Sequence, residues 1–463
     1  MSLLDALTAL TSLLGPRLVT SGSDLANHAR SESHFPDAAP EAVAYPQTTE
    51  EVSRIMAACH AHGVPVTGWG AGSSLEAQSQ PIHGGLVVDF SRMNRLLEVR
   101  PEDMDATLQP GLTREELNTE LRATGLFFPV DPGANASLGG MAMTRASGTT
   151  TVRYGSMRDN VLALEVVLAD GRVIRTGTRA RKSSAGYDLT ALMLGSEGTL
   201  GLVTEMTVRL HPQPEAISAG ITSFESLTGA VETVMETIQS GIPMARIEFA
   251  DAAVARAFNA FADAGMEEKP HLMVEFHGAP EQVRADAERF AEIVSDNGGS
   301  PFRWSDLPEE RRALWDMRHK GYYAILASRP GSRALITDIC VPISRLAEAV
   351  EETQEDLAKA SIPGPILGHV GDGNFHAILL VDPDHPEDLA EAQALSGRMV
   401  ERALRLGGTS TGEHGVGLGK LAYMQAEHGP AWDIMGSLKA ALDPTGILNP
   451  GKLVPQTEPG MAE

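Results

Sequence analysis

Apolar residues recur at helical spacing in residues 48–62, and the Thr48/Glu51 pair at the start of this stretch has the spacing of a capping box. The strand-like runs PVTGW and GLVVDF follow it. A second helix is predicted from Thr113 to Gly125, with its own Thr113/Glu116 box. Because helix and strand patterns alternate in this way to about residue 212, we expect one α+β unit here.

The segment LHPQPEA, residues 210–216, contains two prolines and no periodicity, so it predicts a boundary. Beyond it, strand-like runs such as HLMVEFHG and ALITDICVP lie between four helical patterns, which favours helices packed on an antiparallel sheet. The four helices are expected at residues 225–240, 280–297, 344–359 and 386–406. We therefore expect an α+β fold in two main domains, at residues 41–212 and 213–425. A helical segment at 1–40 would precede them, and an irregular, Pro/Gly-rich C-terminal segment at 426–463 would return to the first domain.

The charge and cysteine content exclude several classes of protein. Lys and Arg number 37 against 61 Asp and Glu, a net charge of −24, which repels nucleic acid and anionic lipid. The two cysteines, Cys59 and Cys340, exclude a disulfide framework and suit a reducing compartment. The apolar start, MSLLDALTALTSLLG, lacks a basic segment and favours an amphipathic helix over a signal peptide. We expect a cytoplasmic protein, possible peripheral attachment to the inner membrane being left open.

Three glycine-rich stretches lie beside strand patterns, at residues 67–78 (TGWGAGSSLEAQ), 129–160 and 195–201 (GSEGTLG). Glycine allows a close approach of the backbone, so consecutive N–H groups can hold an anion. One such stretch is equally well explained as a tight surface loop, but three of them indicate a long, thin ligand held by backbone. The first stretch lacks the GxGxxG spacing, which argues against a nicotinamide cofactor.

These three stretches together resemble the FAD-binding domain of the vanillyl-alcohol oxidase and para-cresol methylhydroxylase superfamily. The resemblance implies that residues 41–212 form an FAD-binding domain. The ending ALDPTGILNPGKL, residues 441–453, resembles that of FAD-dependent D-2-hydroxyacid dehydrogenases, which implies that its asparagine, Asn449, returns to the flavin. Residues 67–78 contain no histidine to tether the flavin, so we expect non-covalent FAD. The residues that the resemblance places at the cofactor are Gly70, Ala71, Gly72, Ser73, Ser74, Pro132, Gly133, Ala134, Ser137, Leu138, Gly139, Gly140, Thr144, Ala146, Ser147, Gly148, Glu197, Gly198, Gly201, Val203 and Asn449.

A candidate metal site comes from GHVGDGNFH and GGTSTGEHGVGLGK. Asp372-Gly373 is a turn signal between apolar runs, so His369 and His376 should fold toward each other. With Glu413 they would offer two imidazoles and a carboxylate, a ligand set suited to a divalent transition metal with open positions for substrate. The alternative is that these are ordinary strand-end histidines beside a glycine-rich turn.

The two segments together resemble the C-terminal half of FAD-dependent D-2-hydroxyacid dehydrogenases. In that family the two histidines and the glutamate hold zinc or manganese, and the next histidine, here His414, is the base. Oxidation of a 2-hydroxy acid removes a hydroxyl proton and sends a hydride to flavin N5, and a metal and an imidazole both assist loss of the proton. Arg318 is our candidate for the substrate carboxylate, a solvated helix arginine being the alternative, and Asn374 would contact the substrate or support the metal ligands.

The sequence gives less information about the substrate and the electron acceptor. The segment LITDICVP has Ile336 and Thr337 where relatives acting on D-2-hydroxyglutarate usually carry a lysine, so a second carboxylate would find less help. The chain is most similar to D-lactate dehydrogenases of the cytochrome-linked type, with glycolate oxidase flavoprotein subunits close. A D-2-hydroxyglutarate dehydrogenase and an inactive flavin- or metal-binding homologue remain alternatives. A cytochrome, a quinone or an electron-transfer flavoprotein would take the electrons, and a homodimer is possible.

Overall fold

The computed structural model describes residues 3–455, and contacts divide the chain into two compact units. Unit 1 contains the chain up to Ser147, residues 155–213 and the chain from Glu413 onward. Unit 2 contains residues 148–154 and 214–412. The chain returns to unit 1 at Glu413 rather than near residue 426, because the backbone amides of residues 416–418 are hydrogen-bonded to Glu76 and Glu197 of unit 1. The N-terminal helical segment is also part of unit 1.

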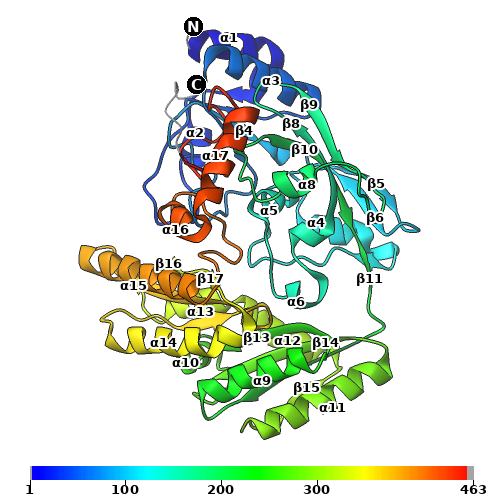
Figure 1. Ribbon diagram of the computed structural model, residues 1–463, viewed down its shortest axis with the longest axis vertical. Helices are drawn as coiled ribbons and strands as arrows, with labels where there is room; N and C mark the ends of the chain where they lie inside the picture. The colour runs from blue at the N-terminus through cyan, green and yellow to red at the C-terminus, as the bar shows by residue number, and fades with distance from the viewer. Residues whose placement is uncertain (1–2, 456–463) are drawn as a thin grey trace. The chain divides into compact units, whose positions relative to one another are not determined.

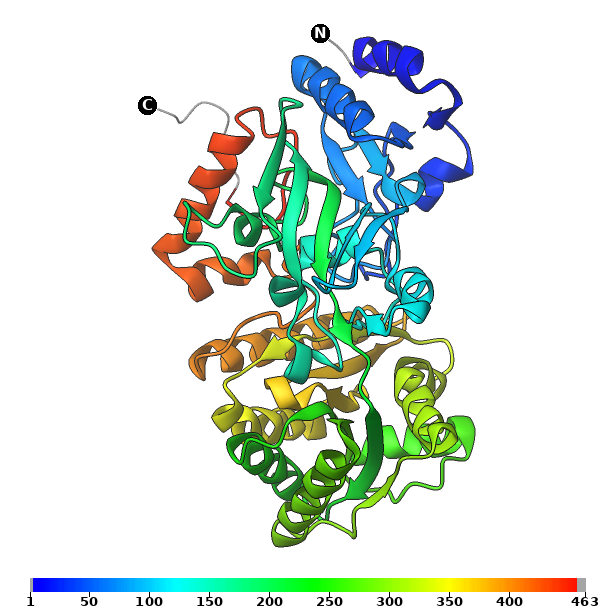
Figure 2. The same ribbon diagram turned by 90° about the vertical axis from the view of Figure 1, so that its right-hand side faces the viewer.

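Unit 1 contains a four-stranded sheet of order β1-β2-β4-β3 and a five-stranded antiparallel sheet of order β5-β6-β10-β8-β9, in which β8 and β10 are the long neighbouring arrows of Figure 2. Its strands are β1 (Leu18–Val19), β2 (Ala42–Ala44), β3 (Val66–Trp69), β4 (Leu86–Asp89), β5 (Leu96–Arg100), β6 (Asp105–Leu108), β8 (Val161–Val167), β9 (Val173–Gly177) and β10 (Leu202–Arg209), with the small pair β7 (Leu126–Phe127) and β11 (His211–Pro212). Its helices are α1 (Leu3–Leu14), α2 (Ser23–Asn27), α3 (Thr49–His62), α4 (Arg114–Glu120), α5 (Leu138–Thr144), α7 (Met157–Asn160), α8 (Leu189–Met193), α16 (Met424–His428) and α17 (Pro430–Leu442).

Two predicted helices of unit 1 begin at their capping residues. Thr48 caps α3 by accepting a hydrogen bond from the Glu51 amide, and the four apolar positions of this helix are buried. The Glu51 carboxylate does not return to Thr48 as in a full capping box, because it pairs with Arg17. The Thr113/Glu116 box at α4 is complete. Helix α1 buries Ala6, Leu10 and Leu14 in the same core as α3, which accounts for the apolar start of the chain.

Unit 2 is an antiparallel sheet of order β15-β12-β14-β13-β18-β19-β16, with β17 also paired to β19, and helices cover it (Figure 1). Its strands are β12 (Ala216–Ser223), β13 (Met244–Ala250), β14 (His271–Gly278), β15 (Arg303–Ser305), β16 (Arg333–Ile336), β17 (Ile339–Cys340), β18 (Ile366–Gly368) and β19 (Asn374–Val381). Its helices are α6 (Thr151–Tyr154), α9 (Leu227–Gln239), α10 (Ala252–Ala262), α11 (Pro280–Asp296), α12 (Pro308–His319), α13 (Gly321–Ala327), α14 (Leu346–Lys359) and α15 (Pro386–Arg405). The four helices expected here correspond to α9, α11, α14 and α15, and the antiparallel sheet is confirmed.

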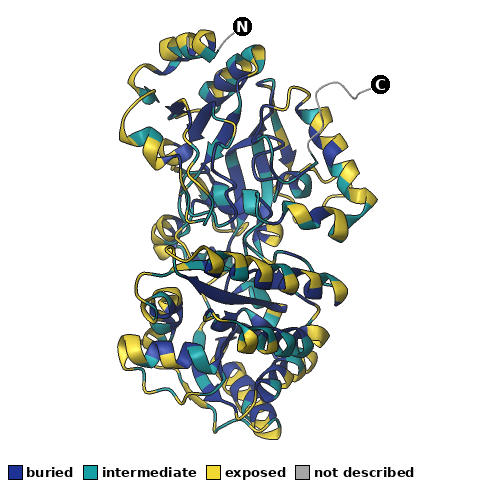
Figure 3. Ribbon diagram, turned by 90° about the vertical axis from the view of Figure 1, so that its left-hand side faces the viewer, coloured by how far each residue is buried: buried dark blue, intermediate teal, exposed yellow. Residues whose placement is uncertain are grey.

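One face of this sheet changes character along its strands. In the strand register, Ala250 lies opposite both Leu367 and His271, so these three residues share one face of the sheet. Side chains two positions apart along a strand point to the same side, so His369, two residues after Leu367, belongs to this face as well. The apolar part of the face packs under helices in a core that includes Ala250, Met273 and Ile378. Its other part carries Glu248, Glu275 and His277, with His376 and Asn374 on the neighbouring β19. All eight residues of β19 are buried (Figure 3). Polar side chains in so buried a sheet must find partners, and these partners define the site described below.

No helix among residues 3–455 is both long enough and apolar enough to cross a membrane.

Candidate functional site

The first two glycine-rich stretches meet inside unit 1. A Cβ atom added at Gly70 would lie 2.3 Å from the Ser137 Oγ, and one added at Gly139 would lie 2.4 Å from the Pro110 Cβ. Ser137 also caps α5, whose first turn is Leu138 to Met141. Glycine at position 70 therefore lets the first loop approach Ser137 at the start of α5, and glycine at position 139 lets α5 approach Pro110. The α5 amides of Leu138 and Gly139 donate to the carbonyls of Leu112 and Pro110.

The third stretch is hydrogen-bonded to the second. The amides of Gly195 and Glu197 donate to the carbonyls of Ala142 and Met143, at 3.0 and 2.9 Å. The three loops that the sequence places far apart thus form one backbone-lined region within unit 1. This arrangement fits a long ligand with a pyrophosphate, such as FAD.

Some residues predicted at the cofactor have side chains committed elsewhere. Leu138, Ala146 and Val203 belong to the hydrophobic core of unit 1, so only their backbone can face a ligand. Gly201 packs against Val166. Asn449 donates from Nδ2 to the carbonyls of Gln78 and Glu197, so it joins the first and third loops.

Glu197 binds the backbone near residue 416, a role that the glycine pattern of its loop does not predict. Its buried carboxylate accepts hydrogen bonds from the amides of Val416 and Gly417, at 2.6 and 2.9 Å. Gln78 donates to the carbonyl of His414 at 2.6 Å. Burial raises the pKa of Glu197 to about 7. The two amide donors favour the charged form and so lower the pKa, but their effect is smaller than that of burial. The loop that carries Glu413 and His414 is therefore fixed to the glycine loops of unit 1.

Glu413 and His414 begin the return of the chain into unit 1. The Ser147 hydroxyl donates to Glu413 Oε2 at 3.2 Å, and His414 Nε2 lies 3.7 Å from Glu413 Oε1. The preceding residue, Gly412, belongs to unit 2, where an added Cβ would lie 2.2 Å from the Asn374 Nδ2.

His369 and His376 lie together in unit 2, as the turn signal predicts. The antiparallel strands β18 and β19 are joined through a 3-10 turn, Val370–Asp372, and Gly373 closes the turn at a φ of 80°. The two imidazole centroids are 5.7 Å apart. An added Cβ at Gly373 would lie 2.0 Å from the Val341 carbonyl oxygen. Only glycine fits this turn, and the turn places the two rings side by side.

The hydrogen bonds of these two histidines fix their tautomers. His376 Nδ1 lies 2.8 Å from the Thr337 carbonyl, which can only accept, so Nδ1 carries the proton. His369 Nδ1 lies 2.7 Å from Glu248 Oε1. Burial would raise the pKa of Glu248, but the charges and hydrogen bonds of His369 and Arg318 hold it below its ordinary value, so this carboxylate accepts. In the neutral rings the lone pair is then on Nε2, the form in which histidine binds a metal.

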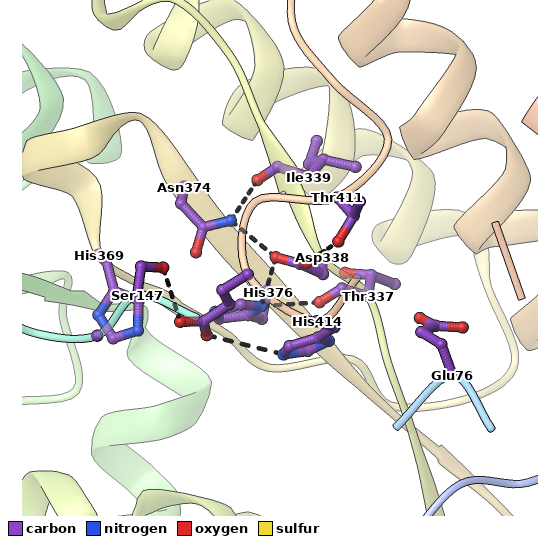
Figure 4. Close-up of polar contacts among 12 residues, drawn as sticks. Glu76, Ser147, Thr337, Asp338, Ile339, His369, Asn374, His376, Thr411 and His414 are labelled. Carbon is purple, nitrogen blue, oxygen red and sulfur yellow. Dashed lines mark hydrogen bonds and ion pairs between the residues drawn. The ribbon is translucent and has the colours of Figure 1, made fainter. Parts of the chain in front are cut away.

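Asn374 presents a buried acceptor next to the two histidines. Its Nδ2 donates to Asp338 Oδ1 at 2.9 Å and to the Ile339 carbonyl at 2.8 Å, and Thr411 donates to the other Asp338 oxygen at 2.6 Å (Figure 4). Within the described residues, Asn374 Oδ1 is buried and accepts no hydrogen bond. An orphaned buried oxygen of this kind is suited to a donor on a bound ligand.

Arg318 is buried, so the alternative of a solvated helix arginine is wrong. It lies on α12 and donates from Nε and Nη2 to Glu248 Oε2, at 2.9 and 2.6 Å. The Nε/Nη2 edge of the guanidinium is therefore engaged. A substrate carboxylate would have to use the remaining Nη1 side.

Two comparisons with known proteins decide the family. Residues 213–453 match the C-terminal domain of FAD-linked oxidases, and residues 40–177 match an FAD-binding domain. The chain belongs to the FAD-linked oxidases. It is 45% identical, over 96% of its length and 91% of the relative, to a probable mitochondrial D-lactate dehydrogenase of Danio rerio. It is 41% identical to a mitochondrial D-lactate dehydrogenase [cytochrome] of Arabidopsis thaliana, over 97% of this chain and 80% of that one.

The fold of this FAD-linked oxidase is shared with p-cresol methylhydroxylase in a substrate-bound structure. That similarity has a TM-score of 0.79 at 19% identity and covers 96% of each chain. This similarity confirms the predicted FAD-binding fold. The FAD-dependent oxidoreductase class is confirmed by the matching FAD-binding domain and by the D-lactate dehydrogenase relatives.

Sequence reasoning missed Glu248 and Asp338, the acidic partners of the oxidase's site residues, and also Glu275, a buried carboxylate outside the proposed site. Glu248 stands in the apolar run MARIEFA, where a charged residue in a buried strand is itself a signal of a specific partner. Glu275, on the adjacent β14, accepts from His277 Nε2 at 2.7 Å and from the Trp315 indole at 2.5 Å, and Tyr154 contacts the other nitrogen of His277 at 2.7 Å. Asp338 lies in the LITDICVP segment and was not among the predicted site residues.

Proposed function

We propose that this FAD-linked oxidase oxidises D-lactate, or a similar short D-2-hydroxy monocarboxylate, to the 2-oxo acid. The names of its relatives support the substrate class. The observation that carries the proposal is the pair of neighbouring histidines whose Nδ1 atoms are both hydrogen-bonded, because in the neutral rings this places the lone pair on Nε2, the form in which histidine binds a metal. Bound FAD supplies the hydride acceptor.

The same proposal assigns His369, His376 and Glu413 to a divalent metal, zinc or manganese. Two imidazoles and a carboxylate suit such an ion and leave open positions. The chain joins Glu413 by a peptide bond to Gly412, which packs against Asn374, so covalent geometry limits how far this carboxylate can be from unit 2. A bound divalent cation supplies Lewis acidity, which makes a hydroxyl a stronger acid.

The residues of the chain then have distinct tasks. His414 accepts the substrate hydroxyl proton, and its carbonyl bond to Gln78 holds the backbone of this base in place. Arg318 binds the substrate carboxylate through Nη1, while Asn374 Oδ1 accepts a hydrogen bond from the bound ligand.

Thr337 supports a substrate with one carboxylate. Its hydroxyl accepts from the Ala377 amide at 2.8 Å and its carbonyl accepts from His376, so this position offers no cation to a second carboxylate. A longer diacid, such as D-2-hydroxyglutarate, would leave a charge unpaired here.

A substrate panel tests this assignment. Purified holoenzyme would be assayed with a dye acceptor and D-lactate, L-lactate, glycolate or D-2-hydroxyglutarate, with flavin bleaching as a second readout. We expect D-lactate to have the highest kcat/KM. A higher value for glycolate or D-2-hydroxyglutarate would replace D-lactate with that acid, and no bleaching with any acid would favour an inactive homologue. Cytochrome, quinone and electron-transfer flavoprotein acceptors would then be compared with D-lactate as donor.

Metal analysis tests the ligand assignment separately. We expect one divalent ion per active chain, with His376→Ala and Glu413→Gln losing the ion and turnover while retaining FAD. The expected flavin residues belong to unit 1 except Gly148, so the unit 2 substitution at His376 should leave most of them intact. Active wild type without a stoichiometric ion would refute the metal assignment.

A further inference from the structure

Glu248 joins two residues that the proposed function uses for different tasks. Its side chain is fully buried on β13. One carboxylate oxygen faces His369 Nδ1 at 2.7 Å, and the other accepts from Arg318 Nε and Nη2 at 2.9 and 2.6 Å. All three residues belong to unit 2, and each contact is charge-assisted and short.

We propose that Glu248 is a positioning residue that sets the metal-binding nitrogen of His369 and the direction of the Arg318 guanidinium at the same time. This inference rests on the proposed function, in which His369 holds the metal and Arg318 the substrate carboxylate. An acceptor at Nδ1 holds the imidazole proton there, directs Nε2 away from Glu248 and raises the basicity of the ring. The same carboxylate engages one edge of Arg318 and so determines which edge remains for substrate.

The position requires a group that only accepts hydrogen bonds. A glutamine at 248 has one carbonyl oxygen and one NH2 group. If its oxygen faced His369, its NH2 would face the N–H donors of Arg318. If its oxygen faced Arg318, its NH2 would favour the His369 tautomer with the proton on Nε2, and this nitrogen could then not bind a metal. Either orientation disrupts one of the two partners, and only an ionised carboxylate satisfies both.

Glu275 provides a matched control within the same sheet. It lies on β14 on the face that carries Glu248, is also buried, and bridges His277 to Trp315. Substitution by glutamine there removes a buried carboxylate of the same kind without touching His369 or Arg318. A general loss of stability would therefore affect Glu275→Gln and Glu248→Gln alike, whereas a loss of positioning would affect only the second.

The first experiment measures Zn²⁺ binding to metal-free holoflavoprotein by competition with a chromophoric chelator. We expect Glu248→Gln to weaken Zn²⁺ binding by roughly 10–100-fold, the range found when the hydrogen-bond partner of a metal-bound histidine is lost. It should also raise the KM for D-lactate. Glu275→Gln should bind Zn²⁺ within a few-fold of wild type. Wild-type Zn²⁺ affinity in Glu248→Gln would overturn the proposal.

The second experiment reads the tautomer directly in metal-free protein, so it does not depend on the metal assignment. In ¹⁵N-histidine spectra, with His369→Ala to identify the signal, wild-type His369 should be protonated at Nδ1. Glu248→Gln should shift the proton toward Nε2, and an unchanged tautomer would overturn the proposal. If wild type shows the expected tautomer but binds no Zn²⁺, the metal assignment fails while the hold of Glu248 on His369 stands.

Should Glu248→Gln lose FAD or its circular dichroism spectrum, Glu248→Asp replaces it. Aspartate retains the charge but is one methylene shorter, so it cannot reach both His369 and Arg318. We expect it to fold, to weaken Zn²⁺ binding or raise the KM, and to leave the other property close to wild type. Wild-type values of both would overturn the proposal.

Discussion

At the scale of single residues, His414 should be separable from the metal ligands. His414→Gln should leave FAD and metal content unchanged and slow flavin reduction by ~10²–10⁴-fold, the usual cost of losing a general base. Because an imidazole must be neutral to accept a proton, wild-type reduction should slow in acid, and this limb should be absent from the variant. Stopped-flow bleaching with D-lactate across pH measures both effects. A variant that reduces its flavin at the wild-type rate would exclude His414 from the reaction.

Glu197 makes a second prediction, on stability. Its folded pKa of about 7 lies above the ordinary 4.5, so the folded state binds a proton more tightly than the unfolded chain. The contribution of this proton to the free energy of unfolding is full below pH 4.5. It is lost as the pH rises through about 7, by up to about 1.4 kcal/mol per pH unit. Relative to Glu197→Gln, wild-type holoprotein should therefore lose stability between pH 5 and 7. Burial lowers the pKa of Lys452 from 10.5 to about 7, so this group changes the stability mainly between pH 7 and 10.5. Urea unfolding at several pH values checks the difference, and parallel curves would contradict it.

The sequence contains the histidines and glycines of the site but not their acidic partners. His369, His376 and Gly373 stand within eight residues, so local spacing is enough to predict their turn. Glu248 meets His369 only because β13 pairs with β18, more than 100 residues later in the chain. Glu197 likewise acts on amides near residue 416. Pairings of this range follow from sheet register, which one sequence does not encode in any local pattern.

At the scale of elements, the turn between β18 and β19 should be intolerant of any side chain. Gly373→Ala adds a Cβ 2.0 Å from the Val341 carbonyl at a φ of 80°, which combines a steric clash with backbone strain. We expect a loss of well over ~1 kcal/mol of stability together with loss of bound metal. Gly331→Ala is the control, because φ is 87° there but the surrounding space is open. It should cost only about 1 kcal/mol and retain the metal. Thermal unfolding with metal analysis compares them, and equal effects would contradict the role of the clash.

Element prediction succeeded where the helical periodicity was long. The 13- and 20-residue helices α9 and α15 have strong apolar stripes and were predicted to within two residues at each end. Strand β13 was not predicted, although its Arg246 and Glu248 alternate with apolar residues. Glu248 is fully buried against His369 and Arg318, whereas Arg246 is half-buried. Buried polar strands defeat the rule that polar positions face water.

At the scale of the whole molecule, the flavin should leave the denatured protein. Residues 67–78 contain no histidine that could form a covalent link, so acid or heat should release all FAD into the supernatant. Absorbance of the protein-free filtrate at the flavin band, against total flavin before denaturation, measures the released fraction. Colour that remains with the precipitated chain after washing in denaturant would refute non-covalent binding.

The division of the chain into two units also determines the order in which its parts can fold during translation. Unit 1 needs the segment after Gly412, since the amide of Val66 bonds to the Ile447 carbonyl and Lys452 binds the carbonyls of Gln78 and Gln80. On a ribosome, the roughly 200 residues of unit 2 must be translated between the two parts of unit 1, a delay of roughly 10–40 s at 5–20 residues per second. Unit 2 can therefore fold while the nascent glycine loops still lack their closing segment. A nascent chain that has not been translated past Gly412 therefore lacks the residues that close the glycine loops of unit 1, and flavin capture should follow the synthesis of these residues.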